Sequence, residues 1–212
     1  MHNRLLTALP LALLMAGCAA QTDRVASAPA TQAAPAASTA AEDTRLLAFL
    51  DAAFDAQVAL SPEYLTSLGS RQDYDRLGDY TLESEARSLA LAERQLAEMR
   101  ARFDPANLGP SARLSYDLFE RQVERDRESA RFDAYSFPVS TNGTPAGSIP
   151  VFLINQHKVA SVSDAEAYIA RLRDSERVMR ETVAVMKQQA EMGIVPPAMV
   201  FEPATADARS IL

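Results

Sequence analysis

The fold of this chain is decided by the stretch SDAEAYIARLRDSERVMRETVAVMKQQAEMG, residues 163–193. Its apolar side chains recur at intervals of three and four residues, which is the spacing of one face of an α-helix. They are Ala165, Tyr168, Ile169, Leu172, Met179, Val183, Met186 and Ala190. The start fits a capping box, in which the Ser163 hydroxyl accepts the N–H of Glu166 and Glu166 reaches back. Gly193 suits the position after a helix, and the two prolines that follow prevent its continuation, so we expect one long helix here.

Three further helices are expected in residues 42–132. The first ends at Ser61-Pro62, the second follows a possible N-cap at Thr81 and stops at Asp104-Pro105, and the third begins near Ser111. Their expected inward side chains are, in order, Leu46, Leu47, Leu50, Phe54 and Val58; Leu82, Ala86, Leu89, Ala92, Leu96, Met99 and Phe103; and Leu114, Leu118, Phe119 and Val123.

The segment between the last two helices, residues 137–162, is apolar and rich in turns but has no helical period. It contains FPVSTNG at 137–143 and IPVFLI at 149–154. A loop this long inside a helical domain is usually functional or packed across a cleft. Four side chains are our candidates for lining such a cleft, two from this loop and two from the last helix: Asn155, His157, Tyr168 and Arg171.

Composition favours the same class of fold. The 212 residues include only seven glycines, too few for the many tight turns of an all-β sandwich, and helix-forming residues dominate. We therefore expect an all-α protein with about four long helices and one long irregular apolar loop. The formal net charge is -7 and there is no basic run, which argues against nucleic acid as a partner because such binding depends on Lys and Arg neutralising phosphates.

The N-terminus has the pattern of an export signal. Arg4 precedes an apolar stretch from Leu5 to Met15 that is too short to span a bilayer, and small residues lead to the only cysteine, Cys18. The run LMAGC at 14–18 resembles a bacterial lipobox, which implies cleavage after residue 17 and a lipid on Cys18. Ala at position 19 then implies the outer membrane, with the protein facing the periplasm. The alternative is a plain signal peptide cut near the same place, which would leave a free thiol.

These features divide the chain into a signal peptide at 1–17, a lipidated cysteine with a disordered tether at 18–42, and a helical domain at 43–212. The tether is rich in Ala, Thr, Ser and Pro, and it has almost no large apolar side chain to offset the entropy cost of ordering. Acylation at Cys18 makes the membrane a partner through the lipid anchor.

No residue of this sequence forms a self-sufficient catalytic or metal site. A zinc peptidase needs two histidines one helical turn apart with a glutamate beside them, whereas only His2 and His157 are present and His2 leaves with the signal. We assign no catalytic residue, no metal ligand and no cofactor. Asp73, Asp75 and Asp79 alternate along a turn, but they lack the spacing of a calcium loop and suit a solvated turn.

Residues 45–200 resemble the N-terminal part of the bacterial domain-of-unknown-function family 885. The likeness rests on SPEYLTSLG at 61–69, YDRL at 74–77, the apolar loop from Phe137-Pro138 to His157, SDAEAYIARL at 163–172, and GIVPP at 193–197. Members of this family are often lipoproteins, are several hundred residues long, and resemble helical zinc peptidases of the gluzincin type. Their zinc-binding motif lies far downstream of any position here.

The resemblance implies that residues 43–212 form one wall of a deep cleft, as an incomplete part of a larger helical domain. Two functions are consistent with it. The first is the N-terminal helical portion of a periplasm-facing lipoprotein related to zinc-dependent peptidases, inactive alone because zinc binds only in full-length relatives. The second is a non-catalytic envelope lipoprotein that binds a peptide or protein partner through the 137–162 loop.

Overall fold

A computed structural model describes residues 33–209, and this part of the chain is all-α, as the sequence predicted. The signal segment 1–17, Cys18 and the first part of the expected tether lie outside it. The helices are α1 (Ala33–Val58), α2 (Pro62–Ser67), α3 (Leu82–Arg102), α4 (Pro110–Ala130), α5 (Pro145–Asn155), α6 (Val162–Glu191) and α7 (Phe201–Arg209). Short 3₁₀ turns lie at Pro105–Asn107, Asp133–Tyr135 and Ala198–Val200. No helix within the described residues is both long and apolar enough to cross a membrane.

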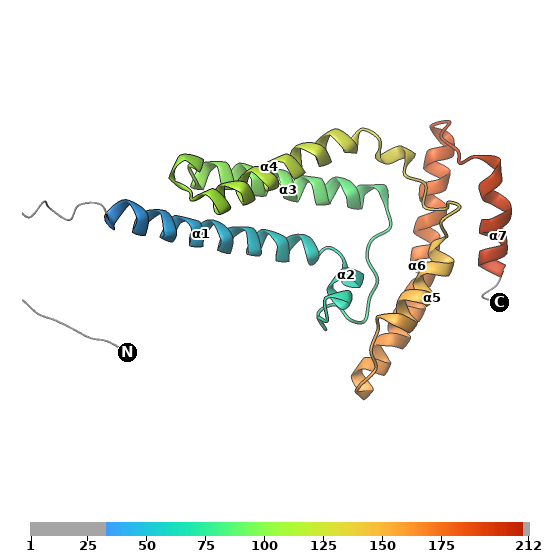
Figure 1. The fold of residues 1–212 in the computed structure, drawn as a ribbon. Helices are drawn as coiled ribbons and strands as arrows, with labels where there is room; N and C mark the ends of the chain where they lie inside the picture. Colours follow the sequence, from blue (N-terminus) through green and yellow to red (C-terminus); the bar gives the residue numbers. More distant parts are fainter. Residues whose placement is uncertain (1–32, 210–212) are drawn as a thin grey trace, which may run out of the picture.

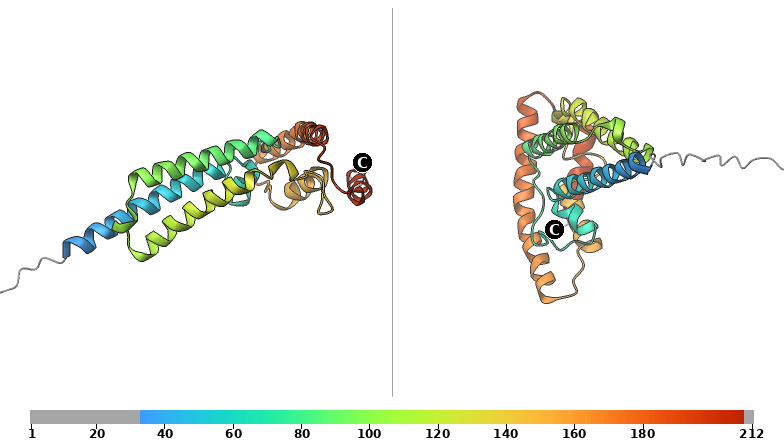
Figure 2. Two further views of the ribbon diagram at one scale, coloured as in Figure 1. Left: turned by 90° about the horizontal axis from the view of Figure 1, so that it is seen from above. Right: turned by 90° about the vertical axis from the view of Figure 1, so that its left-hand side faces the viewer.

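Helices α1, α3 and α4 lie side by side as a three-helix bundle, and α6 runs across one end of it (Figure 1). Helix α5 packs along α6, and α7 contacts α5 (Figures 1 and 2). The short helix α2 and the 69–80 loop connect the bundle to α6. The described chain therefore has two halves: the bundle, and the layer formed by α5, α6 and α7.

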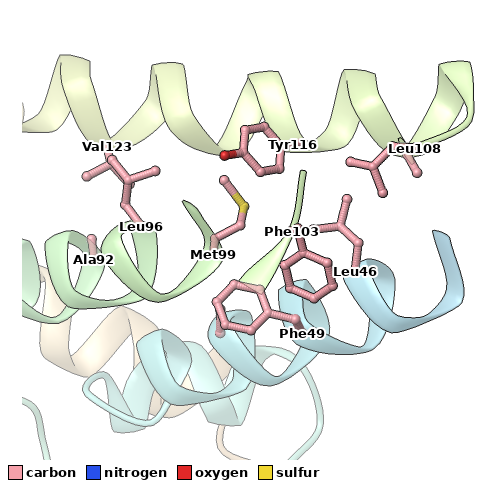
Figure 3. Packing of buried hydrophobic residues seen from close by; sticks show 11 residues of the cluster. Leu46, Phe49, Ala92, Leu96, Met99, Phe103, Leu108, Tyr116 and Val123 are labelled. Carbon is pink, nitrogen blue, oxygen red and sulfur yellow. The ribbon is translucent and has the colours of Figure 1, made fainter. Parts of the chain in front are cut away.

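The bundle holds the larger core. Its buried cluster is formed by Leu46, Phe49, Ala53, Ala92, Leu96, Met99, Phe103, Leu108, Ala112, Tyr116 and Val123. On α1, three of these side chains recur at the spacing of one helix face, as on α3. Figure 3 shows Met99 of α3 pointing toward Tyr116 of α4, while Phe49 and Phe103 lie together with ring centroids 5.7 Å apart.

The second core is much smaller. Its buried cluster is Leu77, Ile149, Leu153 and Val178, drawn from the 69–80 loop, α5 and α6. Partly buried aromatic and methionine side chains pack against it: Tyr80, Phe152, Tyr168 and Met179. The α5–α6–α7 half therefore buries far less apolar surface than the bundle does.

Three expected boundaries are corrected. Helix α1 begins at Ala33 rather than near residue 43, because alanine-rich sequence extends a helix readily and Pro35 falls in the first turn, where its missing N–H has no intrahelical partner anyway. The 137–162 segment is not wholly irregular, because α5 forms within it: Thr144 caps the N-terminus by accepting the N–H of Gly147 at 3.2 Å, and Pro145 takes the first helical position. The N-cap of α6 is Ser161, not Ser163, since the Ser161 hydroxyl accepts the N–H of Asp164.

Several side chains that were expected to point inward are exposed. Leu47, Phe54, Leu114 and Leu118 are each about half exposed, because the buried stripe on each bundle helix is narrower than the apolar one. The apolar stripe of α6 is also not its buried face. The residues of α6 that face inward are Asp164, Ala167, Arg171, Val178, Thr182, Val185 and Gln189. The polar side chains on this face can be buried because their hydrogen-bonding groups have partners, as Gln189 does in donating to the carbonyls of Ala134 and Ser136.

Candidate functional site around Arg171

Arg171 lies on the inner face of α6 and is fully buried. A guanidinium carries five N–H donors and no acceptor, and burying it without partners is very unfavourable. Among the described residues, no carboxylate forms a salt bridge with it. Its charge is instead met by hydrogen-bond acceptors from other parts of the chain.

The acceptors come from several segments at once. Nε donates to the carbonyl of Arg76 at 3.0 Å, and Nη2 donates to Thr66 Oγ1 at 2.8 Å. The same Nη2 lies within hydrogen-bond distance of two further carbonyls, those of Pro62 at 3.2 Å and Asp73 at 3.3 Å. Arg171 therefore joins α2 and the 69–80 loop to α6.

Two aromatic rings cover the guanidinium. Its central carbon lies 4.9 Å from the ring centroid of Tyr74 and 5.1 Å from that of Phe152 on α5. Contacts of this kind stabilise a cation through the negative face of the ring, and they gain strength where water is excluded. Burial still lowers the pKa of Arg171, but a guanidinium starts so far above neutrality that it stays charged.

His157, just beyond α5, is the remaining acceptor. Its Nδ1 accepts from Nη1 of Arg171 at 3.0 Å, and its Nε2 lies 2.9 Å from the carbonyl oxygen of Asp164. Because Arg171 can only donate, Nδ1 must be unprotonated and Nε2 must carry the proton that bonds to the carbonyl. Burial lowers the pKa of His157, and the charge of Arg171 lowers it further. Both ring nitrogens are thus occupied, so in this arrangement the imidazole has no free lone pair for a metal or for base catalysis.

The histidine ring is also held by aromatic neighbours. It stacks on Tyr74 with ring centroids 4.1 Å apart, and it meets the edge of Tyr168 at 5.3 Å. The hydroxyl of Tyr74 accepts the N–H of Lys158 at 2.8 Å and lies 3.1 Å from its carbonyl. The loop that follows α5 is therefore locked against the 69–80 loop.

Asp164, in the first turn of α6, closes the edge of the cluster. Its carboxylate accepts the N–H of Ala160 at 2.9 Å and pairs with Arg71. The hydrogen bond from Ala160 is the main cause that lowers the pKa of Asp164. Arg71 also lies over the Tyr74 ring. This ring therefore contacts two guanidinium groups, that of the partly exposed Arg71 and that of the buried Arg171.

A second polar seam joins the same loop to α2 and to the middle of α6. Both carboxylate oxygens of Glu63 lie 3.0 Å from the N–H of Gly78, and the Tyr80 hydroxyl donates to Glu63 at 3.1 Å. Burial raises the pKa of Tyr80, and the negative charge of Glu63 adds to this. Arg177 of α6 pairs with Asp174, which raises the pKa of Arg177 and lowers that of Asp174.

Arg177 also reaches the carbonyls of Leu77 and Gly78, and it pairs with Glu181. The N–H of Leu77 in turn donates to the Asp174 carboxylate at 2.9 Å. Side chains of α6 thus bind backbone groups in the second half of the 69–80 loop. The cluster around Arg171 and this seam together fix how α6 crosses the end of the bundle.

The structure brings three of the four predicted cleft residues together. His157, Tyr168 and Arg171 meet in the buried cluster, whereas Asn155 lies on the exposed side of α5, where its Nδ2 donates to the carbonyl of Val151 at 2.9 Å. Asn155 lines a separate shallow hollow that also includes Asp207 of α7. The cluster also contains three residues that no sequence pattern had indicated: Thr66, Tyr74 and Asp164. One signal was available: Asp164, Arg171, Val178 and Val185 are spaced by seven residues.

The aspartates of the 69–80 loop do not gather into a cation site. Asp73, which has a left-handed backbone with φ 52°, pairs with Arg76, and Asp79 pairs with Arg87. Within residues 33–209, no three His, Cys, Asp or Glu side chains are grouped so that they could hold a metal ion.

Residues 62–212 match the model of a protein family described as "Bacterial protein of unknown function (DUF885)". The chain belongs to this family. No curated protein and no solved structure matches it. The DUF885 match begins at Pro62, the first residue of α2, and so it includes every segment that contacts Arg171. Helix α1, which contributes to the larger core, precedes the matched region.

Proposed function

We propose that this DUF885 chain is the N-terminal helical portion of a periplasm-facing lipoprotein related to zinc-dependent peptidases, and that it carries no metal site of its own. The observation that carries the proposal is that the two halves differ in the size of their buried apolar clusters. The bundle has a buried cluster of eleven residues, whereas the α5–α6–α7 half has one of four.

The α5–α6–α7 half, which has the smaller core, also exposes many apolar side chains. Ile154 is 74% exposed, Val162 77% and Met199 71%, and other apolar side chains of α5, α6 and α7 are about half exposed. Covering these apolar side chains with other protein would be favourable, because it would remove apolar surface from water. This supports the view that residues 33–209 are part of a larger helical assembly.

The peptidase part of the proposal rests on the family resemblance. In a zinc peptidase the metal activates a water molecule that attacks a peptide carbonyl while a glutamate transfers the proton. This chain would contribute a wall of the substrate cleft, held rigid by the Arg171 cluster. The metal ligands would come from protein outside the described residues.

Purified protein tests this proposal in two ways. We expect it to retain no stoichiometric zinc after dialysis, to hydrolyse no peptide, and to show weaker hydrogen-exchange protection in α5 and α7 than in the bundle. Stoichiometric zinc together with peptidase activity that chelation removes would contradict it. The gene offers a further test: an open frame after the codon for Leu212 that encodes His-Glu-x-x-His supports the proposal.

The alternative function is a non-catalytic envelope lipoprotein that binds a peptide or protein partner. The exposed outer side of α6 favours it, as does the exposed apolar side of α5. It predicts strong protection of α6 in the isolated protein and a stop codon directly after Leu212. Those two results together would favour the alternative over the peptidase relation.

A further inference from the structure

Helix α6 carries an apolar seam on a side of the helix different from its buried, partly polar face. The positions of this outer seam are spaced alternately by three and four residues, as in the a and d positions of a coiled coil. They are Ile169, Leu172, Glu176, Met179, Val183, Met186 and Ala190. At about 100° per residue, the outer seam lies roughly a third of a turn around the helix from the face that holds Arg171.

Much of the outer seam is open to solvent. Ile169 is 46% exposed, Leu172 47% and Val183 48%, while Met179 is partly buried against the smaller core. In the right-hand view of Figure 2, α6 stands at the edge of the molecule, with no other described helix outside it. The single charged position, Glu176, pairs with Arg180 one turn later. A lone polar residue at such a position is compatible with a helix seam and fixes its register.

The flank of the outer seam is basic. Arg173, Arg180 and Lys187 directly follow the d positions, are spaced by seven residues, and are all exposed. The other flank consists of Tyr168, Ser175, Thr182 and Gln189, which carry no charge and lie toward the rest of the chain. A helix packed on the seam therefore meets positive charge along one side only.

This charge pattern selects the kind of partner. In an antiparallel pair of two α6 helices the basic rows would face each other, and in a parallel pair each basic row would face an uncharged row. Neither arrangement brings opposite charges together. An amphipathic helix with an acidic flank would place carboxylates against Arg173, Arg180 and Lys187, and such complementarity sets both partner choice and orientation.

We propose that the outer seam of α6 is a docking surface for an acidic amphipathic α-helix. The inference rests on the proposed function in one respect, because both take residues 33–209 to be an incomplete surface. It goes further in naming what the missing protein presents: apolar side chains at heptad spacing and a row of Asp or Glu beside them. We take this helix to belong to the remainder of the larger helical protein that the proposed function describes.

The test uses the full chain and two synthetic helical peptides of about four heptads, with Leu at a and d in both and either Glu or Lys at every e and g. Like charges at e and g keep each peptide monomeric. We expect the Glu peptide to bind at least about tenfold more tightly than the Lys peptide, and its affinity to fall as salt is raised. Fluorescence anisotropy of labelled peptide measures both.

Three variants sharpen the result. Val183→Glu, in the outer seam, should weaken the Glu peptide at least about tenfold, and the triple variant Arg173→Glu/Arg180→Glu/Lys187→Glu should reverse the preference between the peptides. Val151→Glu, at a 59% exposed apolar residue of α5, is the matched control and should change nothing. The triple variant alters only exposed side chains, so it keeps the test valid if Val183→Glu fails to fold by circular dichroism.

Equal binding of the two peptides, or no binding to folded protein, would overturn the proposal. So would self-association of the protein that Val183→Glu abolishes, because the seam would then bind a second copy. The zinc content and peptidase activity that test the proposed function do not depend on the outer seam. Failure of this inference is therefore distinguishable from failure of the proposed function.

Discussion

Arg171 donates a hydrogen bond to Nδ1 of His157 across 3.0 Å within the buried face of α6. This contact requires a neutral imidazole, since a proton on Nδ1 would remove the acceptor and set a second positive charge beside the guanidinium. Other charged groups near the ring are Asp164 and Arg71, and Tyr74 and Tyr168 enclose it. The cluster therefore ties the stability of the α5–α6 connection to pH.

The protein should lose stability in acid through His157. Its pKa is lowered on folding from an ordinary value of 6.5, so below that pH the unfolded chain takes up a proton that the folded chain resists. The stabilisation is fully present above about pH 6.5 and declines as the pH falls below it. Urea unfolding at a series of pH values measures this decline. In His157→Asn, whose Oδ1 can still accept from Arg171 but does not titrate, the decline between pH 7.5 and 5.5 should be smaller; an unchanged slope would contradict the assignment.

Replacing Arg171 should destabilise the protein strongly. Arg171→Met fills similar volume but leaves the acceptors at Arg76, Thr66 and His157 buried without a donor, which costs about 3 kcal/mol of unfolding free energy. The control is Arg180→Met on the outer side of the same helix, where the side chain is 69% exposed and the change should stay within about 0.5 kcal/mol. Chemical denaturation compares them. Similar losses in the two variants would show that Arg171 is not the residue that joins these segments.

The proposed lipid anchor predicts that membrane attachment depends on Cys18. With Cys18→Ser we expect no labelling by radioactive palmitate and release of the protein from the membrane fraction, because two or more acyl chains are what make attachment stable. Ala19→Asp is the matched variant: it should keep the lipid but shift the protein between envelope membranes on density gradients. Unaltered fractionation of Cys18→Ser would favour a plain signal peptide instead.

The sequence predicted the class of fold and the long helices, because their apolar spacing and stop signals are local. Pro62 and Pro105 mark helix boundaries in both the sequence and the structure. The sequence did not indicate α5 because residues 137–162 are apolar and rich in turns and have no helical period, although Thr144-Pro145 is itself a helix-start pattern. Pro145 costs no hydrogen bond at the first helical position, whereas Pro150 lies inside α5 and removes one, yet the helix continues through it.

The candidate site was predicted only in part, for a different reason. Apolar periodicity pointed to Ile169 and Leu172 as the inner side of α6, yet Arg171 between them is buried and they are half exposed. A buried arginine depends on carbonyls from segments far away in sequence, and no local pattern reports these. The carbonyl of Arg76 and the hydroxyl of Thr66 can be placed only once the 69–80 loop has folded against α6.

The start of α6 gives a direct test of two competing caps. Both Ser161 to Asp164 and Ser163 to Glu166 fit the same four-residue pattern, but only Ser161 has extended backbone, with φ -142° and ψ 169°, and its hydroxyl accepts the N–H of Asp164 at 3.1 Å. The Asp164 carboxylate then reaches back to the N–H of Ala160. Ser161→Ala should therefore cost about 1 kcal/mol of unfolding free energy, whereas Ser163→Ala should cost only a few tenths.

The comparison is well controlled because both substitutions remove one hydroxyl from exposed residues two positions apart. Each also loses the contact between the two hydroxyls, 2.9 Å apart, so that contact cancels in the difference. Urea denaturation at pH 7.5 keeps Asp164 ionised and His157 neutral in both variants. If Ser163→Ala proved the more damaging change, α6 would begin two residues later, with Asp164 as its first residue, and the assignment of Ser161 as the N-cap would be wrong.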